Sequence, residues 1–353
     1  FSDSVYIDRL SRIPAVMEMP YNDIIRKFID MYAGRLRNQV SFMLSACNFY
    51  MPIFEEALDA YGLPLELRYL PIIESALNPS AVSRAGASGL WQFMIGTGKI
   101  YGLESNSLVD ERRDPIKATW AAARYLKEMY DIYGDWNLVI AAYNCGPGTI
   151  NKAIRRANGE TDYWKIYNYL PKETRGYVPA FIAANYVMTY YCDHNICPME
   201  TNIPASTDTV QVNKNLHFEQ IADLCNVPLD QIKSLNPQYK KQIIPGDNKP
   251  YTLRLPIEAI STFIDRQDTI FTHRADELFR NRKTVAVKEI SPSTRRAATA
   301  VAGKGKPTYY KIKSGDTLSS IAEKYGVRVK DIQRWNGMSN TKIAAGKRLK
   351  IYK

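Results

Sequence analysis

The sequence predicts a multidomain α+β protein, with a long helical region followed by two small modules of strands and helices. Apolar residues recur at helical spacing through most of the region before Ala205. From Ala205 the pattern changes to short strand, helix, helix and short strand, and Thr308 to Tyr352 repeats it. We therefore expect a helical segment at 1–62 packed on a helical domain at 63–200, a first small module at 205–256, a partly helical linker at 257–306 and a second small module at 307–353.

The length and composition of the chain are those of an ordinary globular protein. At 353 residues it has room for about two or three domains, and its contents of 45% hydrophobic and 24% charged residues are unexceptional. No apolar run approaches the roughly 20 residues that a membrane-spanning helix needs. The formal net charge of +11 favours a polyanionic partner, such as nucleic acid, anionic lipid or an anionic cell wall. The sequence contains no nucleic-acid motif, so we expect no nucleic-acid partner.

The cysteines and histidines do not indicate a metal or cofactor site. They form neither an HExxH motif nor a CxxC pair, so we expect no metal and no cofactor. Because the number of cysteines, five, is odd, at least one thiol is free or pairs between chains. Cys192 and Cys197 are close enough in sequence to bridge locally, but buried free thiols fit the sequence equally well.

The first part of the helical region reads as support for the domain that follows it. Residues 6–61 have helical patterns, and one apolar stripe includes Ile25, Phe28, Ile29 and Tyr32. We interpret this stripe as the surface by which residues 1–62 pack on the adjoining helical domain.

Further helices are expected at 116–133, 136–143 and 173–188. Asp114 and Pro115 suit the start of the first of these, because aspartate caps helices and proline is tolerated in the first helical turn. These helices complete the predicted all-helical domain.

The stretch 63–94 carries the first candidate functional residue, Glu74. Leucines recur at helical spacing around it, and Glu74 lies on the same apolar stripe. A carboxyl group on an apolar surface is costly to ionise, so its pKa should rise toward the range that a general acid needs near neutral pH. Asn78 and Pro79 are expected to stop this helix just after the carboxylate. The alternative is a solvated glutamate at the end of a helix.

Four blocks of sequence occur in a specific order around this glutamate. They are Ile73-Glu74-Ser75, Gly86 to Met94 (GASGLWQFM), Ala141 to Gly148 (AAYNCGPG) and Glu173 to Val178 (ETRGYV). This set resembles the soluble lytic transglycosylase family, whose domain is related to goose-type lysozyme, and within that family it resembles the membrane-bound D branch. The resemblance covers residues 63–184, and it departs from the family pattern at Ile95-Gly96 and at Cys145.

The resemblance implies a lysozyme-like domain that cleaves peptidoglycan without consuming water. Glu74 would protonate the glycosidic oxygen between N-acetylmuramic acid and N-acetylglucosamine, and the muramyl N-acetyl group would stabilise the cationic centre. Glu74 would then take the proton of the muramyl C6 hydroxyl, which attacks C1 and leaves a 1,6-anhydromuramyl end. Besides catalytic Glu74, the resemblance assigns substrate-binding roles near the cut to Ser88 and Gln92, at the N-acetyl group to Tyr143 and Asn144, and at the floor or rim of the cleft to Glu173 and Tyr177.

The distribution of carboxylates favours this reaction but leaves alternatives open. Most glycosidases use two carboxylates that flank the scissile bond. No Asp or Glu follows Glu74 until Glu104, although Asp110 or Asp114 could supply a second carboxylate. The open alternatives are a hydrolytic muramidase and a non-catalytic protein that binds peptidoglycan.

The two small modules align with each other at a fixed offset, so that Ile221 matches Ile321 and Asn236 matches Asn336. The second module contains the run Ser314-Gly315-Asp316-Thr317-Leu318 and resembles the lysin motif (LysM), a βααβ module that binds chains containing N-acetylglucosamine. The first module has Lys-Asn-Leu-His at 214–217 where Ser-Gly-Asp-Thr is expected. For the first module, the resemblance therefore implies the fold but not the sugar affinity.

Together these resemblances imply peptidoglycan glycan strands as the partner and cell-wall remodelling as the role. They also imply a location in the cell envelope, on the periplasmic side. The chain starts at Phe1 rather than at a methionine, and a removed signal or lipid anchor that associates the protein with the outer membrane is compatible with this start.

Overall fold

The computed structural model describes residues 1–279 and most of 308–352, leaving aside 313–315, 326, 328, 337, 339–342 and 344–345. The chain divides into two compact units, Phe1–Ile290 and Ser291–Lys353. The flexible part of the linker, expected at 291–306, lies outside the described residues. Across the described part of the chain, no helix is both long enough and apolar enough to cross a membrane.

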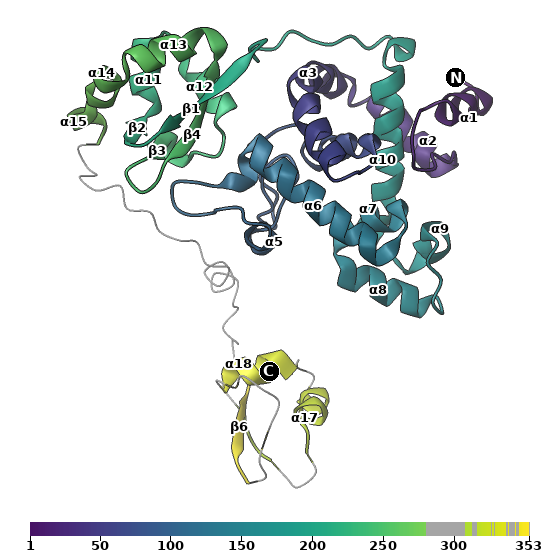
Figure 1. The fold of residues 1–353 in the computed structure, drawn as a ribbon. Helices are drawn as coiled ribbons and strands as arrows, with labels where there is room; N and C mark the ends of the chain where they lie inside the picture. The colour runs from purple at the N-terminus through teal and green to yellow at the C-terminus, as the bar shows by residue number, and fades with distance from the viewer. Residues whose placement is uncertain are drawn as a thin grey trace. The chain divides into compact units, whose positions relative to one another are not determined.

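The first unit opens with three helices, α1 (Asp3–Ser11), α2 (Asp23–Ala33) and α3 (Arg37–Ala60). Asn22 caps α2, and its side-chain oxygen accepts hydrogen bonds from the backbone N–H groups of Ile24 and Ile25. The apolar stripe predicted on α2 is buried at its centre, and the helix packs against the long helix α10 (Lys172–Tyr190). Figure 1 shows α2 and α10 next to each other although far apart in sequence.

The rest of the helical domain is built from short and medium helices around one large core. The core includes Trp91, which is fully buried, donates its indole N–H to the Thr119 hydroxyl at 2.9 Å and packs edge-to-face on Phe54. The other elements are η1 (Leu65–Tyr69), α4 (Leu70–Ser75), α5 (Ile95–Ile100), η2 (Glu111–Arg113), α6 (Pro115–Tyr133), α7 (Trp136–Cys145), α8 (Pro147–Arg156), α9 (Tyr163–Ile166), η3 (Tyr167–Tyr169) and η4 (Cys192–His194).

The helix that carries Glu74 is shorter than the leucine spacing predicts. Residues 65–69 form a 3₁₀ helix, and α4 ends at Ser75. Ala76 and Leu77 both have positive φ angles, of 51° and 58°, so the helix stops before Asn78 and Pro79 are reached. The prediction that this pair stops the helix was therefore wrong, and the left-handed turn places Glu74 in the last turn of α4.

The predicted start of α6 is confirmed. The Asp114 carboxylate accepts hydrogen bonds from the backbone N–H groups of Ile116 and Lys117, at 2.9 and 3.0 Å, and Pro115 is the first helical residue. α7 runs to Cys145, two residues beyond the predicted end, because the chain turns only at Gly146, where φ is +81°.

The region after residue 205 has the predicted strand–helix–helix–strand order. Strand β1 pairs antiparallel with β4, with Thr207 opposite Pro256, and an additional short pair, β2 with β3, was not predicted. Helices follow β4 in the segment predicted as a partly helical linker. The elements are β1 (Thr207–Val212), β2 (Asn215–His217), α11 (Phe218–Cys225), α12 (Leu229–Leu235), η5 (Lys240–Gln242), β3 (Ile243–Pro245), β4 (Tyr251–Pro256), α13 (Ile257–Asp265), α14 (Gln267–Thr272) and α15 (Ala275–Leu278).

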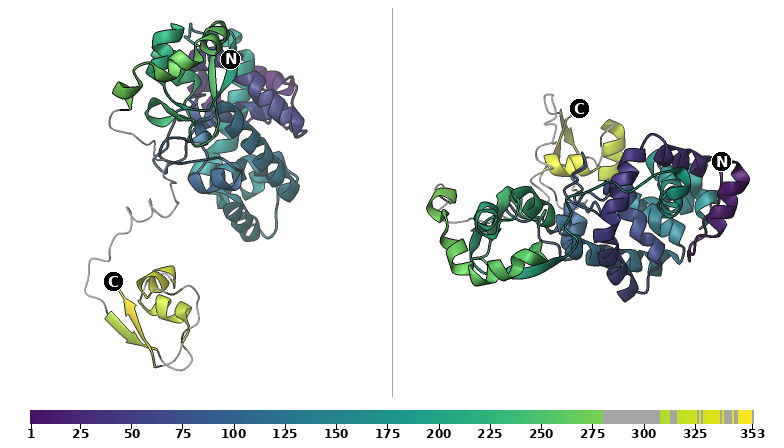
Figure 2. Two further views of the ribbon diagram at one scale, coloured as in Figure 1. Left: turned by 60° about the vertical axis from the view of Figure 1, so that its left-hand side comes forward. Right: turned by 90° about the horizontal axis from the view of Figure 1, so that it is seen from above.

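The second unit repeats the same order on a smaller scale. Its elements are β5 (Thr308–Lys311), α17 (Leu318–Tyr325), α18 (Val329–Trp335) and β6 (Arg348–Ile351), with β5 and β6 antiparallel. Figures 1 and 2 show this two-stranded sheet with its two helices in yellow. The predicted fold class, a helical domain with small βααβ modules, is confirmed.

One asparagine has the same structural role in both modules, fully buried at 236 and half-buried at 336. The Asn236 amide donates to the carbonyl oxygens of Ile232 and Arg254, and its side-chain oxygen accepts from the Arg254 N–H. Asn336 makes the equivalent three bonds, to Ile332 and Lys350. In each module the asparagine ties the second helix to the last strand, which explains why the sequence alignment pairs these two positions.

Candidate active site

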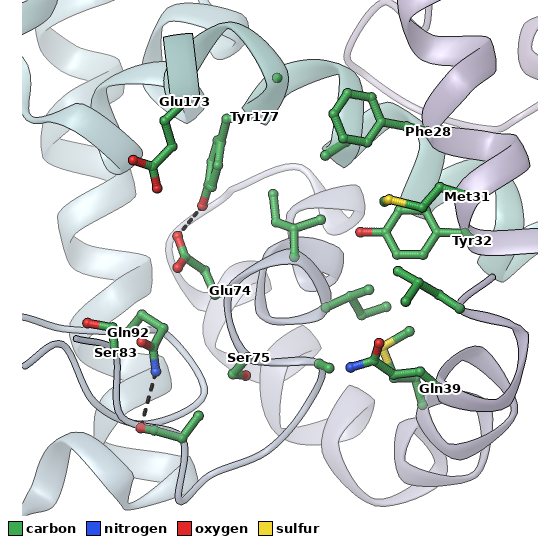
Figure 3. Close-up of a pocket in the computed structure, with 18 of the residues that line it drawn as sticks. Phe28, Met31, Tyr32, Gln39, Glu74, Ser75, Ser83, Gln92, Glu173 and Tyr177 are labelled. Carbon is green, nitrogen blue, oxygen red and sulfur yellow. Dashed lines mark hydrogen bonds between the residues drawn. The ribbon is translucent and has the colours of Figure 1, made fainter. Parts of the chain in front are cut away.

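Glu74 opens onto a cavity of about 610 Å³ in the helical domain. The wall that carries Glu74 is the end of α4, and α10 and the turn around Gln92 form two other sides. α2 forms a further side with Phe28, Met31 and Tyr32, as Figure 3 shows. The cavity is thus assembled from several segments that are distant in sequence.

The Glu74 carboxylate accepts a short hydrogen bond from the Tyr177 hydroxyl. Burial raises the pKa of Glu74 from its ordinary value of 4.5 to about 7, the Tyr177 bond opposes that rise, and the negative charge of Glu173 adds to it. The predicted elevation of the pKa is confirmed in direction and cause. A carboxyl group of this kind can donate a proton and accept it back near neutral pH.

Glu173 is the other carboxylate of the cavity. It lies in the first turn of α10, is exposed, and in Figure 3 stands beside Tyr177 on the side facing Glu74. Among the described residues that line the cavity, Glu74 and Glu173 are the acidic ones. Asp110 is instead buried in an ion pair with Arg112, and Asp114 caps α6, so neither is part of this lining.

The turn at residues 86–93 brings Gln92 into the cavity but not Ser88. Gln92 has a φ of 49°, lines the cavity, and donates its amide to the carbonyl oxygens of Ala81 and Gly89. Ser88 is fully buried, and its hydroxyl accepts a hydrogen bond from the Arg113 side chain at 3.1 Å. Ser88 is not among the residues that line the cavity, and its expected contact with a sugar stays a prediction.

Tyr143 and Asn144 are half-buried and are not among the residues that line the cavity. The Tyr143 hydroxyl donates to the Trp91 carbonyl at 2.7 Å, and Asn144 accepts from the Thr174 hydroxyl at 2.9 Å. Burial raises the pKa of Tyr143 well above its ordinary value, and the charge of Glu74 adds to that rise. Tyr143 is therefore within electrostatic reach of Glu74, although it is not among the residues that line the cavity.

Residues of the N-terminal helices also line the cavity, and the sequence reasoning did not anticipate this. Phe28, Met31 and Tyr32 come from α2 and Gln39 from α3. The apolar stripe on α2 contained two of them, but periodicity does not distinguish a residue packed in a core from one at the edge of a cavity.

The five cysteines are all unpaired thiols in this structure, including Cys192 and Cys197, which are both exposed. Within the described residues, no group of three or more His, Cys, Asp or Glu side chains could hold a metal ion.

Comparison with known proteins identifies the parts of the chain. Residues 51–166 match the family described as Transglycosylase SLT domain. Residues 206–271 match the family described as Lytic transglycosylase MltD, LysM-like domain, and residues 310–351 match the LysM domain family. A lysozyme-like helical domain with an acidic residue in its cavity, followed in the sequence by LysM-type modules, defines a lytic transglycosylase.

Two curated proteins and one solved structure illustrate what the chain is similar to. The chain is 31% identical to Membrane-bound lytic murein transglycosylase D of Escherichia coli strain K12, over 95% of this chain and 70% of that protein. It is 33% identical to the Soluble lytic murein transglycosylase of the same strain, over 33% of this chain and 19% of the relative. The crystal structure of the 70 kDa soluble lytic transglycosylase from Escherichia coli covers 40% of this chain and 24% of that chain, with 29% identity and a TM-score of 0.36. The chain belongs to the membrane-bound lytic murein transglycosylase D family.

Membership of this family confirms the resemblance read from the four sequence blocks. It also confirms the assignment of the protein as an enzyme of the lytic transglycosylase class, in preference to a non-catalytic binding protein.

We predict that Gly89→Ala destabilises the helical domain and that Gly96→Ala does not. Gly89 has a φ of +88°, and a Cβ there would lie 1.7 Å from the Arg112 carbonyl oxygen, whereas a Cβ at Gly96 would meet nothing within 4 Å. The expected loss for Gly89→Ala is on the order of 3 kcal/mol. Urea unfolding followed by circular dichroism measures both variants, and equal stabilities would contradict the close contact between the turn and Arg112.

A second prediction concerns the pH dependence of stability. The folded state holds the Glu74 proton up to about pH 7, whereas a carboxyl with the ordinary pKa of 4.5 releases it earlier. Between these values the folded state binds more protons than the unfolded state, so this contribution to stability is lost as pH rises. Glu74→Gln mimics the protonated form, so its melting temperature should exceed that of the wild type by a margin that grows from pH 4.5 to about 7.

Thermal melts of both proteins across this pH range measure the margin, and Glu56→Gln is the matched control, because Glu56 is exposed and does not line the cavity. A margin that stays constant with pH would show that Glu74 titrates normally.

Proposed function

We propose that Glu74 acts first as the acid and then as the base in a non-hydrolytic cleavage of the bond between N-acetylmuramic acid and N-acetylglucosamine. The observation that carries the proposal is the Glu74 carboxyl group, which lies in a cavity of about 610 Å³ and has its pKa raised to about 7. One of its oxygens accepts a hydrogen bond from the Tyr177 hydroxyl. Near neutral pH such a group is present in both protonation states, as a group that alternates between acid and base requires.

The proposed reaction has two balanced steps. In the first, protonated Glu74 gives its proton to the glycosidic oxygen, the bond from that oxygen to C1 breaks, and the muramyl N-acetyl oxygen shares its electrons with the cationic C1. In the second, the Glu74 carboxylate takes the proton of the C6 hydroxyl while the C6 oxygen forms a bond to C1. The acid is restored, no water is consumed, and the products are a 1,6-anhydromuramyl end and a free N-acetylglucosamine end.

The neighbours of Glu74 have supporting roles in this proposal. Tyr177 holds the carboxylate in one orientation, and Gln92 and Glu173 present polar groups to the sugar from two sides of the cavity. Tyr143 and Asn144 orient the N-acetyl group. Ser88 supports the turn that carries Gln92.

Binding of peptidoglycan by this chain is supported by the LysM domain match and by the murein-cleaving relatives. We propose that the partner is the glycan strand of peptidoglycan, which the LysM module holds through its N-acetylglucosamine units. The location that fits such a substrate is the periplasmic side of the cell envelope, where a lipid anchor would associate the protein with the outer membrane. The cellular role is then remodelling of the wall.

A hydrolytic muramidase remains the second candidate, and one observation favours it. Glu173 shares the cavity with Glu74, so the site contains a pair of carboxylates after all. In a two-carboxylate hydrolase the second group activates water or attacks C1. The two candidates therefore differ in whether Glu173 takes part in the chemistry.

We predict that Glu74→Gln lowers the rate of glycan cleavage by about 10²–10⁴-fold, because the amide can neither give nor take the proton. Glu173→Gln should retain most of the activity, and the digest should contain anhydro ends. Mass spectrometry of digested peptidoglycan measures rate and product together. Reducing ends, with a loss in Glu173→Gln as severe as that in Glu74→Gln, would favour the muramidase.

The pH profile tests the same assignment independently. Glu74 must be protonated for the first step, so kcat/KM on a soluble glycan oligomer should fall as pH rises through about 7. Since the substrate supplies the attacking hydroxyl, the acid side should be shallow. A steep acid limb that disappears in Glu173→Gln would mean that an ionised second carboxylate is required.

We predict that removal of residues 308–353 weakens binding to insoluble cell wall but spares turnover of short soluble glycans. These residues fall in a compact unit of their own, so the cavity of the first unit is left complete. A tethered binding module raises the local concentration of substrate without changing the chemistry. Sedimentation with purified peptidoglycan measures the binding, and equal binding by both proteins would contradict the role given to the LysM module.

A further inference from the structure

The loop between α5 and α6 belongs to two cores at once. We call residues 104–114 the bridging loop and residues 206–271 the internal module. Leu108 and Val109 of the loop are 1% and 0% exposed, and they are part of the hydrophobic core formed by the internal module. Figure 1 shows the loop extending from the helical domain to this module. The core of the internal module is therefore incomplete without residues from the sequence of the catalytic domain.

Backbone hydrogen bonds also join the loop to the module. The Asp110 N–H donates to the Gln238 carbonyl at 2.9 Å, and the Lys240 N–H donates to the Leu108 carbonyl at 2.6 Å. Val109 and Tyr239 form an antiparallel bridge. These bonds give the loop a defined conformation, which a surface loop of this length would otherwise lack.

The module also contributes a positive charge to this contact. The Lys240 ammonium donates to the Asn106 carbonyl at 2.7 Å and lies 3.9 Å from the Asp110 carboxylate. Asp110 in turn forms a two-pronged ion pair with Arg112, with bonds of 2.8 and 2.7 Å. Both side chains are nearly inaccessible, at 2% and 5% exposure, so the geometry of this pair is strongly constrained.

The same guanidinium group holds the turn beside the active site. The Arg112 Nη1 atom donates to the carbonyl oxygens of Gly86 and Phe93, at 2.8 and 2.9 Å, and so ties together the two ends of the 86–93 turn. The Gly89 backbone lies close to the Arg112 backbone, since a Cβ at Gly89 would fall 1.7 Å from the Arg112 carbonyl oxygen. The arginine is thus the connection between the bridging loop and the turn.

The turn reaches the catalytic centre in two ways. It carries Gln92 into the cavity, and its Leu90 carbonyl accepts a hydrogen bond from the Ser75 hydroxyl at 2.9 Å. Ser75 follows Glu74 in the last turn of α4. A displacement of the turn would move both Gln92 and the residue next to Glu74.

From this chain of contacts we propose that the internal module is a positioning element of the catalytic site, acting through Asp110 and Arg112 to hold the 86–93 turn against Glu74. Arg112 is the central positioning residue. The inference rests on the proposed role of Glu74, and it goes beyond it by giving a LysM-like module a task in catalysis instead of sugar capture. A misplacement of about 1 Å at reacting groups is enough to cost on the order of 10²-fold in rate.

Three full-length variants test the proposal on a soluble glycan oligomer. Arg112→Lys keeps the charge but cannot bridge Asp110, Gly86 and Phe93 with one planar group. Lys240→Met removes the charged contact from the module side. Lys241→Met is the matched control, because Lys241 is the exposed neighbour in the same short helix.

We expect Arg112→Lys to lower kcat by about 10- to 100-fold while KM changes by less than about threefold. Lys240→Met should lower kcat by a few fold, roughly two to ten, and Lys241→Met should leave it unchanged. The double variant of Arg112 and Lys240 should be no slower than Arg112→Lys alone, because both act on one connection. Hydrogen exchange should increase at residues 86–93 in the Arg112 and Lys240 variants and stay unchanged in α7.

Unchanged kcat and unchanged exchange in Lys240→Met would overturn the proposal, and this variant decides even if Arg112→Lys does not fold. Loss of wall binding by Lys240→Met, with a normal kcat on the soluble oligomer, would also overturn the proposal. That result would make the internal module a sugar-binding module. Failure of the proposed role of Glu74 would give other results. Wild-type digests would then contain reducing ends, or Glu74→Gln would remain active.

Discussion

The hydrogen bond between Tyr177 and Glu74 joins two helices whose residues are about a hundred positions apart in the chain. It can exist only while α10 lies across the end of α4, and α10 is held there by its packing against α2 and α7. The same packing buries part of the carboxyl group, and this burial raises its pKa to about 7. The position of one proton donor therefore depends on the assembly of the entire helical domain.

The burial that makes Glu74 a useful acid works against the stability of the fold when the group is ionised. A carboxylate in apolar surroundings lacks the hydration it has in the unfolded chain. The Tyr177 hydroxyl offsets part of this penalty by bonding to the charged form, while the charge of Glu173 increases it. This balance keeps the pKa of Glu74 near neutral pH. The large core around Trp91 stabilises the domain and offsets the penalty of burying the carboxylate.

Several features could be read from the sequence because they depend on residues only a few positions apart. The Asp114 cap of α6 and the apolar stripe of α2 follow from backbone hydrogen bonding and helical periodicity. The pairing of Asn236 with Asn336 follows from the repeat, and in both modules the side chain makes the same bonds. The likeness of four short blocks to a known family likewise pointed to Glu74, because such blocks carry the chemistry.

Only the tertiary structure decided which of these residues reach the cavity. It buried Ser88, brought Phe28 into the cavity wall and placed Leu108 and Val109 in the core of the internal module. None of this is encoded in local periodicity, since a helix or loop shows the same pattern whichever distant segment it meets. The sequence by itself determined most helices and strands and the candidate acid, Glu74. The lining of the site was decided by long-range packing, because packing fixes the side-chain directions only once the whole domain has formed.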